Sequence, residues 1–255
     1  MIDKVIIKKN FSRSAKFYDQ YAVIQNLCAL ELIKKTGLDS FSRILDIGCG
    51  TGNYTQLLRD KFPFARIKAI EISSPMVEIA RKKLKAKGIE FILGDGESIN
   101  LGEQFDLISS NVSFQWFEDL NQALSRYRKL LKKGGVILFS IFGPRTFYEL
   151  NKALEELCGL VSPISASYFA TASRIEQMLN DNFQDSRVER KNYKKRYTSI
   201  QELFKTIKYT GARGNGLAGK KIWTSKMLNN LERIYKTKFK EIMATYEVFF
   251  CRGVK

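Results

Sequence analysis

Short apolar runs alternate with amphipathic segments between residues 42 and 142. The apolar runs have the length of strands and read, in chain order, RILDI, RIKAIEI, IEFILGD, FDLISS and GVILFSIF. The segments between them place apolar residues three or four apart, as helices do, over roughly 52–61, 75–87 and 119–132. This alternation predicts an α/β fold with a parallel sheet that is covered by helices on both faces.

Helical patterning also flanks this region. Residues 11–35 are expected to be helical, because apolar side chains from Phe17 to Ile33 recur at spacings near three and four. Further helices are expected after Pro144, at TFYELNKALEEL and near 173–181, 199–209 and 224–236. The charged, alternating segment FQDSRVERKNYKKRYT predicts an exposed strand near a sheet edge, and ATYEVFFCRG predicts a final strand.

The chain contains no linker long enough to separate two domains. We therefore expect one domain over 1–255, with a helical cap at 1–36, a ligand-binding core at 42–142, and the rest of the sheet plus a helical elaboration at 144–240. Four glycines in GARGNGLAGKK, residues 211–221, indicate a mobile loop in that last region.

Composition narrows the class of protein. No stretch approaches the roughly 20 apolar residues of a membrane-spanning helix, and MIDKVIIKKN lacks the apolar core of a secretory signal. We therefore expect a cytoplasmic protein without a membrane partner. The four cysteines form no C-x-x-C pair, so we expect free thiols rather than a disulfide framework or a metal site; they are Cys28, Cys49, Cys158 and Cys251.

Charge and one missing residue type bear on function. The formal net charge is +17, and residues 187–221 hold eleven Lys or Arg against Glu189 and Glu202. This excess favours an anionic partner such as nucleic acid, an acidic membrane or an acidic protein, although a solvated basic face explains it equally well. The chain has no histidine, which excludes Ser–His, Cys–His and histidine–metal chemistry.

A glycine-rich turn follows the first predicted strand in RILDIGCGTGNYTQLL, residues 43–58. Its third glycine comes one place too early for the G-x-G-x-x-G of dinucleotide enzymes, and it lacks the Gly-Lys-Ser/Thr ending of a phosphate-binding P-loop. A plain tight turn is the alternative for an isolated cluster of this kind, so the residues around it decide the interpretation.

Three carboxylates stand at the ends of the first three predicted strands. Asp46 precedes the first glycine, Glu71 ends the second strand where it could accept both ribose hydroxyls, and Asp95 ends the third where it could accept from an adenine amino group. Asp46 would repel a pyrophosphate but attract an amino group and a sulfonium. The trio therefore favours S-adenosylmethionine over NAD.

These segments resemble the successive motifs of class I S-adenosylmethionine-dependent methyltransferases. LDIGCGTGNYT, AIEISSPMVEIARKKL, GDGESI, FDLISSNVSFQW and LKKGGVILFSIFGP carry the resemblance in order and spacing. A narrower resemblance joins FSRSAKFYDQYAVIQ, SNVSFQW, FGPRTFYEL, KYTGARGNG and TYEVFFCRG to the malonyl-acyl-carrier-protein O-methyltransferases of biotin synthesis. It spans most of the chain, but it is loose over 155–198.

The resemblance implies a Rossmann-like fold with a seven-stranded, mainly parallel sheet and a helical lid elaboration. It also implies S-adenosylmethionine as cofactor, S-adenosylhomocysteine as its product, and a small acidic acyl carrier protein bearing a malonyl thioester as partner. The residues that it adds to the three acids of the cofactor site are Gly48, Gly50, Ile72, Gly96, Glu97 and Asn111.

The resemblance implies that the methyl group is transferred to the free carboxyl of the malonyl thioester. Such a carboxylate acceptor fits a chain without histidine, because it is already ionised at pH 7 and needs positioning rather than a base. Arg145, just past the fifth strand, is expected to grip it through its guanidinium fork, with Tyr18 as a neutral helper. Gln115 and Trp116 are expected to shape the acceptor pocket, and Lys208 and Tyr209 to reach the acceptor.

Seven basic residues are expected to steer an acidic carrier protein as a group: Arg187, Lys191, Lys194, Lys195, Arg213, Lys220 and Lys221. Three other interpretations stay open. They are a methyltransferase for another small acceptor such as a quinone precursor or a trans-aconitate-like acid, an RNA methyltransferase, and a cofactor-binding scaffold without catalysis. The absence of a recognisable RNA-binding module and of an N-P-P-Y-like motif makes nucleic acid the less favoured partner.

Overall fold

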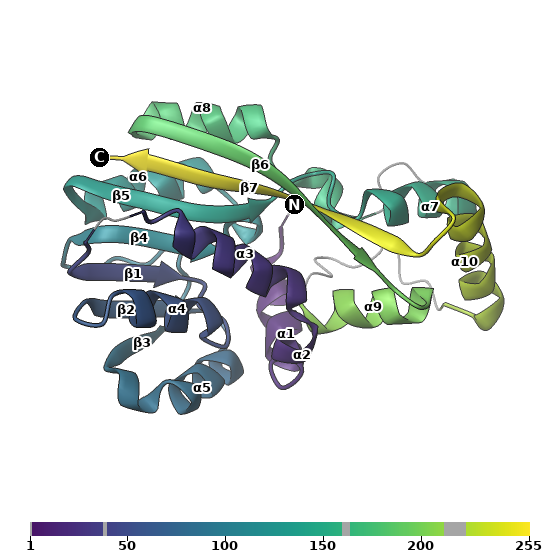
Figure 1. Cartoon of the computed structure of the whole chain (residues 1–255), viewed down its shortest axis with the longest axis horizontal. Helices are drawn as coiled ribbons and strands as arrows, with labels where there is room; N and C mark the ends of the chain where they lie inside the picture. Colours follow the sequence, from purple (N-terminus) through teal and green to yellow (C-terminus); the bar gives the residue numbers. More distant parts are fainter. Residues whose placement is uncertain (1, 38–39, 160–163, 212–222) are drawn as a thin grey trace.

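A computed structural model of the chain describes residues 2–37, 40–159, 164–211 and 223–255. Its centre is a seven-stranded sheet in the order β3-β2-β1-β4-β5-β7-β6 (Figure 1). The strands are β1 Arg43–Ile47, β2 Arg66–Glu71, β3 Ile89–Leu93, β4 Phe105–Asn111, β5 Leu131–Phe142, β6 Gln184–Arg196 and β7 Met243–Val254. Among the strands of the described residues, β7 alone runs opposite to the direction of the other six, so the predicted mainly parallel sheet is confirmed.

Helices cover both faces of the sheet. α3 (Val23–Lys34) and α4 (Asn53–Lys61) pack on one face, and α6 (Leu120–Leu130) and α8 (Ala172–Asn182) pack on the other. Successive side chains of β1 point to opposite faces, so Ile44 belongs to the first core and Leu45 to the second. Burial on both faces explains why the central strands are almost continuously apolar.

Three further helices gather beyond one end of the sheet, at the right of Figure 1: α7 Tyr148–Cys158, α9 Ile200–Tyr209 and α10 Ser225–Phe239. Their buried residues Leu150, Leu203 and Leu231 belong to the same hydrophobic cluster as Ile44, so this elaboration shares its core with the sheet. In the described part of the chain, no helix is both long and apolar enough to cross a membrane.

The N-terminal region differs from its prediction. Instead of one helix over 11–35, the chain forms α1 (Lys4–Ser14), α2 (Tyr18–Tyr21) and α3. The first helix begins earlier because the side chain of Asp3 accepts the backbone N–H groups of Val5 and Ile6. The breaks between these helices contain no glycine or proline, so the helical spacing concealed them.

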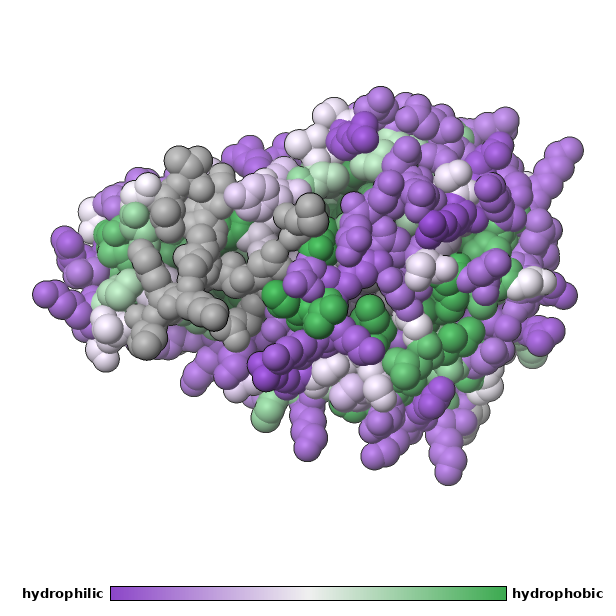
Figure 2. All heavy atoms as spheres, turned by 180° about the vertical axis from the view of Figure 1, so that it is seen from behind, coloured by the Kyte–Doolittle hydropathy of each residue, from purple (hydrophilic) through white to green (hydrophobic). Residues whose placement is uncertain are grey.

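The C-terminal half agrees with its pattern. β6 forms an edge of the sheet, as its alternating charges predict, and β7 pairs with both β5 and β6. Of the predicted mobile loop 211–221, all residues after Gly211 lie outside the described residues, and so do the basic residues Arg213, Lys220 and Lys221. Hydrophilic side chains cover most of the face seen in Figure 2, with apolar atoms in patches between them.

α5 (Ser74–Lys83) completes the β2–β3 unit, and it lies beside α1. It begins directly after the carboxyl end of β2 and has Pro75 in its first turn, which suits a helix start because that position needs no donor. Three cysteines, Cys28, Cys49 and Cys251, are buried free thiols, and Cys158 is half-buried.

Candidate active site at the carboxyl ends of the strands

A cavity opens where the carboxyl ends of β1, β2, β3 and β4 meet α1. This is the edge at which parallel α/β sheets bind ligands. Its walls are formed by Lys4, Ile7, Phe11, Tyr18, Ile47, Gly48, Gly50, Ile70, Glu71, Ile72, Met76, Gly94, Asp95, Gly96, Asn111, Val112, Ser113, Trp116 and Phe117.

The cavity brings together most of the predicted cofactor residues. Those on its walls are Gly48, Gly50, Glu71, Ile72, Asp95, Gly96 and Asn111, together with Tyr18 and Trp116 from the predicted acceptor side. The other predicted residues do not line it; they are Asp46, Glu97, Gln115, Arg145, Lys208 and Tyr209.

The glycine turn lets the backbone form part of the cavity wall. Gly48 has φ 72°, a left-handed conformation that favours glycine, and a Cβ there would lie 2.1 Å from the Ser113 hydroxyl oxygen. The N–H groups of Gly48 and Cys49 both donate to the Ile70 carbonyl, at 2.8 and 3.0 Å, which ties the turn to the end of β2.

Glu71 is held rigidly at the end of β2. Its two carboxylate oxygens accept the backbone N–H groups of Gly50 at 3.1 Å and Ser73 at 2.8 Å. Burial raises the pKa of this carboxyl, while the N–H groups of Ser73, Gly50 and Ile72 act against that rise. A carboxylate has about four lone-pair sites, so Glu71 keeps acceptor capacity for a ligand hydroxyl held in a fixed orientation.

Asp46 lies behind the glycine turn and is fully buried. The Thr55 hydroxyl donates to one of its oxygens at 2.6 Å, and the other oxygen has no hydrogen-bond partner. Burial raises the pKa of the Asp46 carboxyl to about 7; the Thr55 hydrogen bond opposes this shift and Glu71 adds to it. A buried carboxylate with an unsatisfied oxygen is suited to a cationic ligand, which would favour its ionised form.

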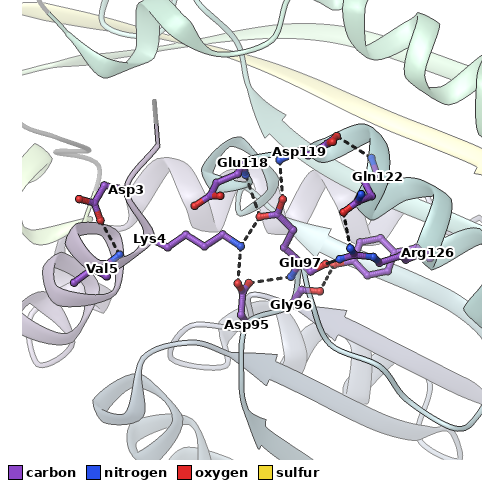
Figure 3. A network of polar contacts seen from close by, with 11 residues as sticks. Asp3, Lys4, Val5, Asp95, Gly96, Glu97, Glu118, Asp119, Gln122 and Arg126 are labelled. Carbon is purple, nitrogen blue, oxygen red and sulfur yellow. Dashed lines mark hydrogen bonds and ion pairs between the residues drawn. The ribbon is translucent and has the colours of Figure 1, made fainter.

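Asp95 and Glu97 share a lysine from α1 (Figure 3). Lys4 Nζ lies 2.5 Å from an Asp95 oxygen and also forms an ion pair with Glu97. Burial lowers the pKa of Lys4, but the hydrogen bonds to the two carboxylates outweigh it and the net shift is upward. Glu97 also accepts the backbone N–H groups of Glu118 and Asp119, so it supports the Asp95 turn from behind the cavity.

The end of β4 is strained and closely held. Val112 has φ 45°, which is costly for a β-branched residue, and its N–H donates to the carbonyl and hydroxyl oxygens of Ser140 at 3.0 and 3.1 Å. Gln115 donates its amide to the Val112 carbonyl at 2.7 Å. Gln115 therefore touches the strained residue, and its predicted contact with an acceptor stays a prediction.

Aromatic rings form the wall beside α1. Phe11 packs edge-on against Trp116 at 6.2 Å between ring centroids and is tilted against Tyr18 at 6.4 Å. Burial and the nearby carboxylate of Glu71 raise the pKa of Tyr18 above its usual range. Tyr18 is therefore a neutral hydrogen-bond donor at neutral pH rather than a base.

The remaining predicted acceptor residues lie outside the cavity wall. Arg145 is exposed just past β5; its guanidinium lies 5.5 Å from the Tyr148 ring, and its backbone N–H donates to buried Glu247 at 2.9 Å. Lys208 is exposed, and the Tyr209 ring packs against Phe17 and Tyr21.

The contribution of α1 to the cavity was not predicted from the sequence. Lys4, Ile7 and Phe11 line the cavity from the inner face of this helix. A signal was available, because Asp3 is a favoured helix-capping residue and the three side chains follow it at i, i+3 and i+7 spacing.

Comparison with known proteins now identifies the family. A family model described as a methyltransferase domain matches residues 45–139. A malonyl-acyl-carrier-protein O-methyltransferase from Acetivibrio thermocellus is 37% identical over 273 residues, which cover 100% of this chain and 95% of the relative. The chain belongs to the malonyl-acyl-carrier-protein O-methyltransferase family. Another member, from Priestia megaterium, is 40% identical over 83% of this chain and 82% of its own length.

Solved structures support the fold of this O-methyltransferase. The YcgJ protein of Bacillus subtilis superposes with a TM-score of 0.60 at 17% identity, covering 90% of this chain and 98% of its own. Phosphoethanolamine N-methyltransferase 2 of Haemonchus contortus, solved with S-adenosylmethionine, superposes with a TM-score of 0.57 at 19% identity. The match covers 89% of this chain and 52% of the Haemonchus contortus chain. The chain has the Rossmann-like methyltransferase fold, and S-adenosylmethionine is its cofactor.

The residues present fit that cofactor. The unsatisfied oxygen of buried Asp46 and the fixed carboxylate of Glu71 provide acceptors behind and beside a turn without side chains. Asp95, with Lys4 bound to it, provides a polar contact at the β3 end of the cavity. When bound, S-adenosylmethionine supplies an electrophilic methyl group on a sulfonium. Tyr18, which is uncharged at neutral pH, lies on the wall of the same cavity.

Proposed function

We propose that this enzyme methylates the free carboxyl of a malonyl group carried by an acidic acyl carrier protein, giving the methyl ester as an early step of biotin synthesis. The observation that carries the proposal is the cavity, which joins a cofactor site rich in carboxylates to an aromatic wall without a general base. The names of the relatives give the acceptor class. We place the reaction in the cytoplasm.

The chemistry needs no proton transfer. A malonyl carboxylate is ionised at neutral pH, so its oxygen can take the methyl group directly while the electron pair of the broken bond stays on sulfur. The catalytic demand is alignment of that oxygen with the methyl carbon and exclusion of water. Phe11 and Trp116 supply apolar walls, and Tyr18 supplies a donor that can fix a carboxylate oxygen.

Arg145 is proposed to hold the second carboxylate oxygen. Its position past β5 is supported by backbone contacts, since Glu247 accepts the Arg145 N–H at 2.9 Å and the Glu247 carbonyl accepts from Gly143. The guanidinium itself is exposed, lies over the Tyr148 ring, and has no ion-pair partner among the described residues. It is therefore available to an acceptor, which could pair with it through two parallel hydrogen bonds.

A labelled-methyl assay tests the function. Incubation with S-adenosylmethionine labelled in its methyl group should transfer label to malonyl carrier protein and to malonyl-pantetheine, but not to bulk RNA or to the unacylated carrier. Label in RNA alone would contradict the proposal, as would tight cofactor binding without transfer to either malonyl acceptor.

Arg145→Ala tests the acceptor contact. We expect kcat/KM for both malonyl acceptors to fall about tenfold to a hundredfold, because a charge-assisted pair is lost. The cofactor Kd, measured by calorimetry, should change less than about twofold, and exposed Arg128→Ala serves as the matched control. Unchanged turnover in Arg145→Ala would remove this residue from the site.

A further inference from the structure

α1 presents two chemically different faces. Its inner face belongs to the cavity, where Ile7 is buried, Phe11 packs against Trp116, and Lys4 reaches Asp95 (Figure 3). The helix is therefore the part of the cavity wall that separates the site from solvent on this side. Whatever binds the outer face of α1 lies directly over the site.

The outer face of α1 is both apolar and basic. Val5 is 78% exposed and Ile6 is 37% exposed, so two neighbouring aliphatic side chains reach the surface of the helix. Lys9 and Arg13 are also exposed, and at about 100° per residue all four side chains point within about 100° of one another. We call these four residues the α1 outer face.

The two cations of the α1 outer face are not neutralised by the protein. Within the described ranges, neither Lys9 nor Arg13 has a carboxylate within ion-pair distance. The basic strand β6 differs, because most of its cations are already paired. These pairs are Arg187–Asp185 at 3.3 Å, Arg190–Glu247 at 2.8 Å, Lys191–Glu31 at 3.1 Å and Arg196–Glu241 at 2.7 Å.

We propose that the α1 outer face is the docking surface for the acyl carrier protein, which binds it through carboxylates opposite Lys9 and Arg13 and apolar side chains over Val5 and Ile6. This inference rests on the proposed function. Charge complementarity supports a partner of this kind, since the enzyme carries +17 and leaves these cations unpaired. Two aliphatic side chains at the start of the helix favour a protein surface over a nucleic acid, whose backbone offers phosphates.

The location explains how a tethered acceptor could enter. Because the inner face of the same helix lines the cavity, a carrier bound outside α1 brings its acyl arm to the rim of the site. The predicted steering group on β6 and the loop after Gly211 stays a prediction, and the α1 outer face is proposed as the docking surface because it lies at the cavity itself.

Charge reversal with a matched control tests the proposal. Lys9→Glu/Arg13→Glu changes the net charge by the same amount as Arg128→Glu/Lys133→Glu. Arg128 and Lys133 are exposed and lie near the amino end of β5, away from the cavity at the carboxyl ends of the strands. Neither has an ion-pair partner among the residues described. Each variant is assayed with malonyl carrier protein and with malonyl-pantetheine, and cofactor binding by calorimetry reports whether the fold is intact.

We expect the α1 variant to raise KM for malonyl carrier protein at least about tenfold and to leave kcat/KM for malonyl-pantetheine within about twofold. The Arg128/Lys133 variant should change neither value by more than about twofold. Equal losses in the two variants would overturn the proposal, because only total charge would then matter. So would an α1 variant with unchanged KM, or one that instead loses binding to bulk RNA. A wild-type enzyme inactive on both acceptors would overturn the proposed function, and the docking surface with it.

Discussion

At the scale of single residues, the buried carboxylate of Asp46 suits a cationic ligand but lowers the stability of the folded state. Its carboxylate is buried with one oxygen unpaired, and its pKa is raised to about 7. Below that pH the folded state takes up a proton that the unfolded chain, with its usual pKa near 4, does not. Burial of this carboxylate therefore costs stability above about pH 7, and that cost disappears as pH falls toward 4.

Asp46→Asn should expose this cost. At pH 8 the variant without cofactor should be more stable than wild type by about 2 kcal/mol, since the buried charge is gone although its amide lacks one partner. At pH 5 this gain in the free energy of unfolding should vanish. At pH 8 the variant should also bind the cofactor more weakly than wild type does. Urea unfolding at the two pH values measures the difference.

Asp106→Asn provides a control of opposite sign. Burial raises the pKa of Asp106, but Lys132 and the N–H groups of Arg43 and Ser42 together hold it below its usual range. A carboxyl of this kind stabilises the folded state above its unfolded pKa, so the variant should be destabilised to the same extent at pH 8 and pH 5. The loss should shrink only as pH falls below about 4. If both variants responded to pH in the same direction, the account of Asp46 would be wrong.

The three acids could be found from the sequence because strand ends are predictable and parallel strands end at one edge. Arg145 shows the limit of that reasoning. The sequence places it after a strand, but the direction of an exposed guanidinium depends on its neighbours, here the Tyr148 ring. No periodicity contains that information.

At the scale of elements, the glycine turn depends on close approach to the β4 end. Gly48→Ala would place a Cβ 2.1 Å from Ser113 Oγ and 2.5 Å from its Cβ, next to strained Val112. We expect the free energy of unfolding to fall by about 3 kcal/mol or more and cofactor binding to be lost, because the neighbouring backbone must move.

Gly88→Ala is the matched control for that loss. Gly88 also has positive φ, 61°, but a Cβ there meets nothing within 4 Å. It should cost only about 1 kcal/mol of backbone strain, with cofactor affinity unchanged. Equal unfolding free energies for the two variants would mean that the contact with Ser113 is unimportant.

The attachment of α1 depends on Lys4. Lys4→Met keeps the side-chain stem but removes the ion pairs to Asp95 and Glu97, so backbone amides of α1 should exchange with deuterium about two- to fivefold faster. Lys8→Met, on the same helix but exposed and unpaired among the described residues, should leave exchange unchanged. Identical protection in both variants would show that apolar packing alone holds α1.

The element scale also shows where periodicity fails. Strands β1, β2, β4 and β5 were found because they are largely buried and bounded by turns. β3 lies at an edge of the sheet, and its short apolar run revealed it. The breaks before Tyr18 and at Ala22 were missed, since Ala22 is buried by packing and no residue there resists a helix. Tertiary contacts, rather than local preference, set these helix ends.

At the scale of the whole molecule, charge and fold have different origins. The sheet follows from the apolar pattern, and the family follows from similarity over the full chain. The net charge of +17 predicts an anionic partner without saying where it binds. Only the structure separates paired cations on β6 from unpaired ones on α1, because ion pairs join residues far apart in sequence.

Salt should therefore act on one acceptor and not the other. Raising the ionic strength from about 0.05 to 0.3 M should increase KM for malonyl carrier protein several-fold, because screening weakens attraction between exposed charges. KM for malonyl-pantetheine, whose only charge is the reacting carboxylate, should change much less. Steady-state kinetics at several salt concentrations checks this, and equal salt dependence would contradict electrostatic docking.

The most direct test of the account is intact-protein mass spectrometry of malonyl carrier protein after incubation with enzyme and S-adenosylmethionine. We predict a mass increase of one methyl group in place of the carboxylate's hydrogen, and no increase with Glu71→Gln at limiting cofactor. The added methyl group should leave the carrier together with the acyl group when neutral hydroxylamine cleaves the thioester. A carrier that keeps its original mass while wild-type enzyme binds the cofactor, or a methyl group that stays on the carrier after the thioester is cleaved, would contradict the prediction.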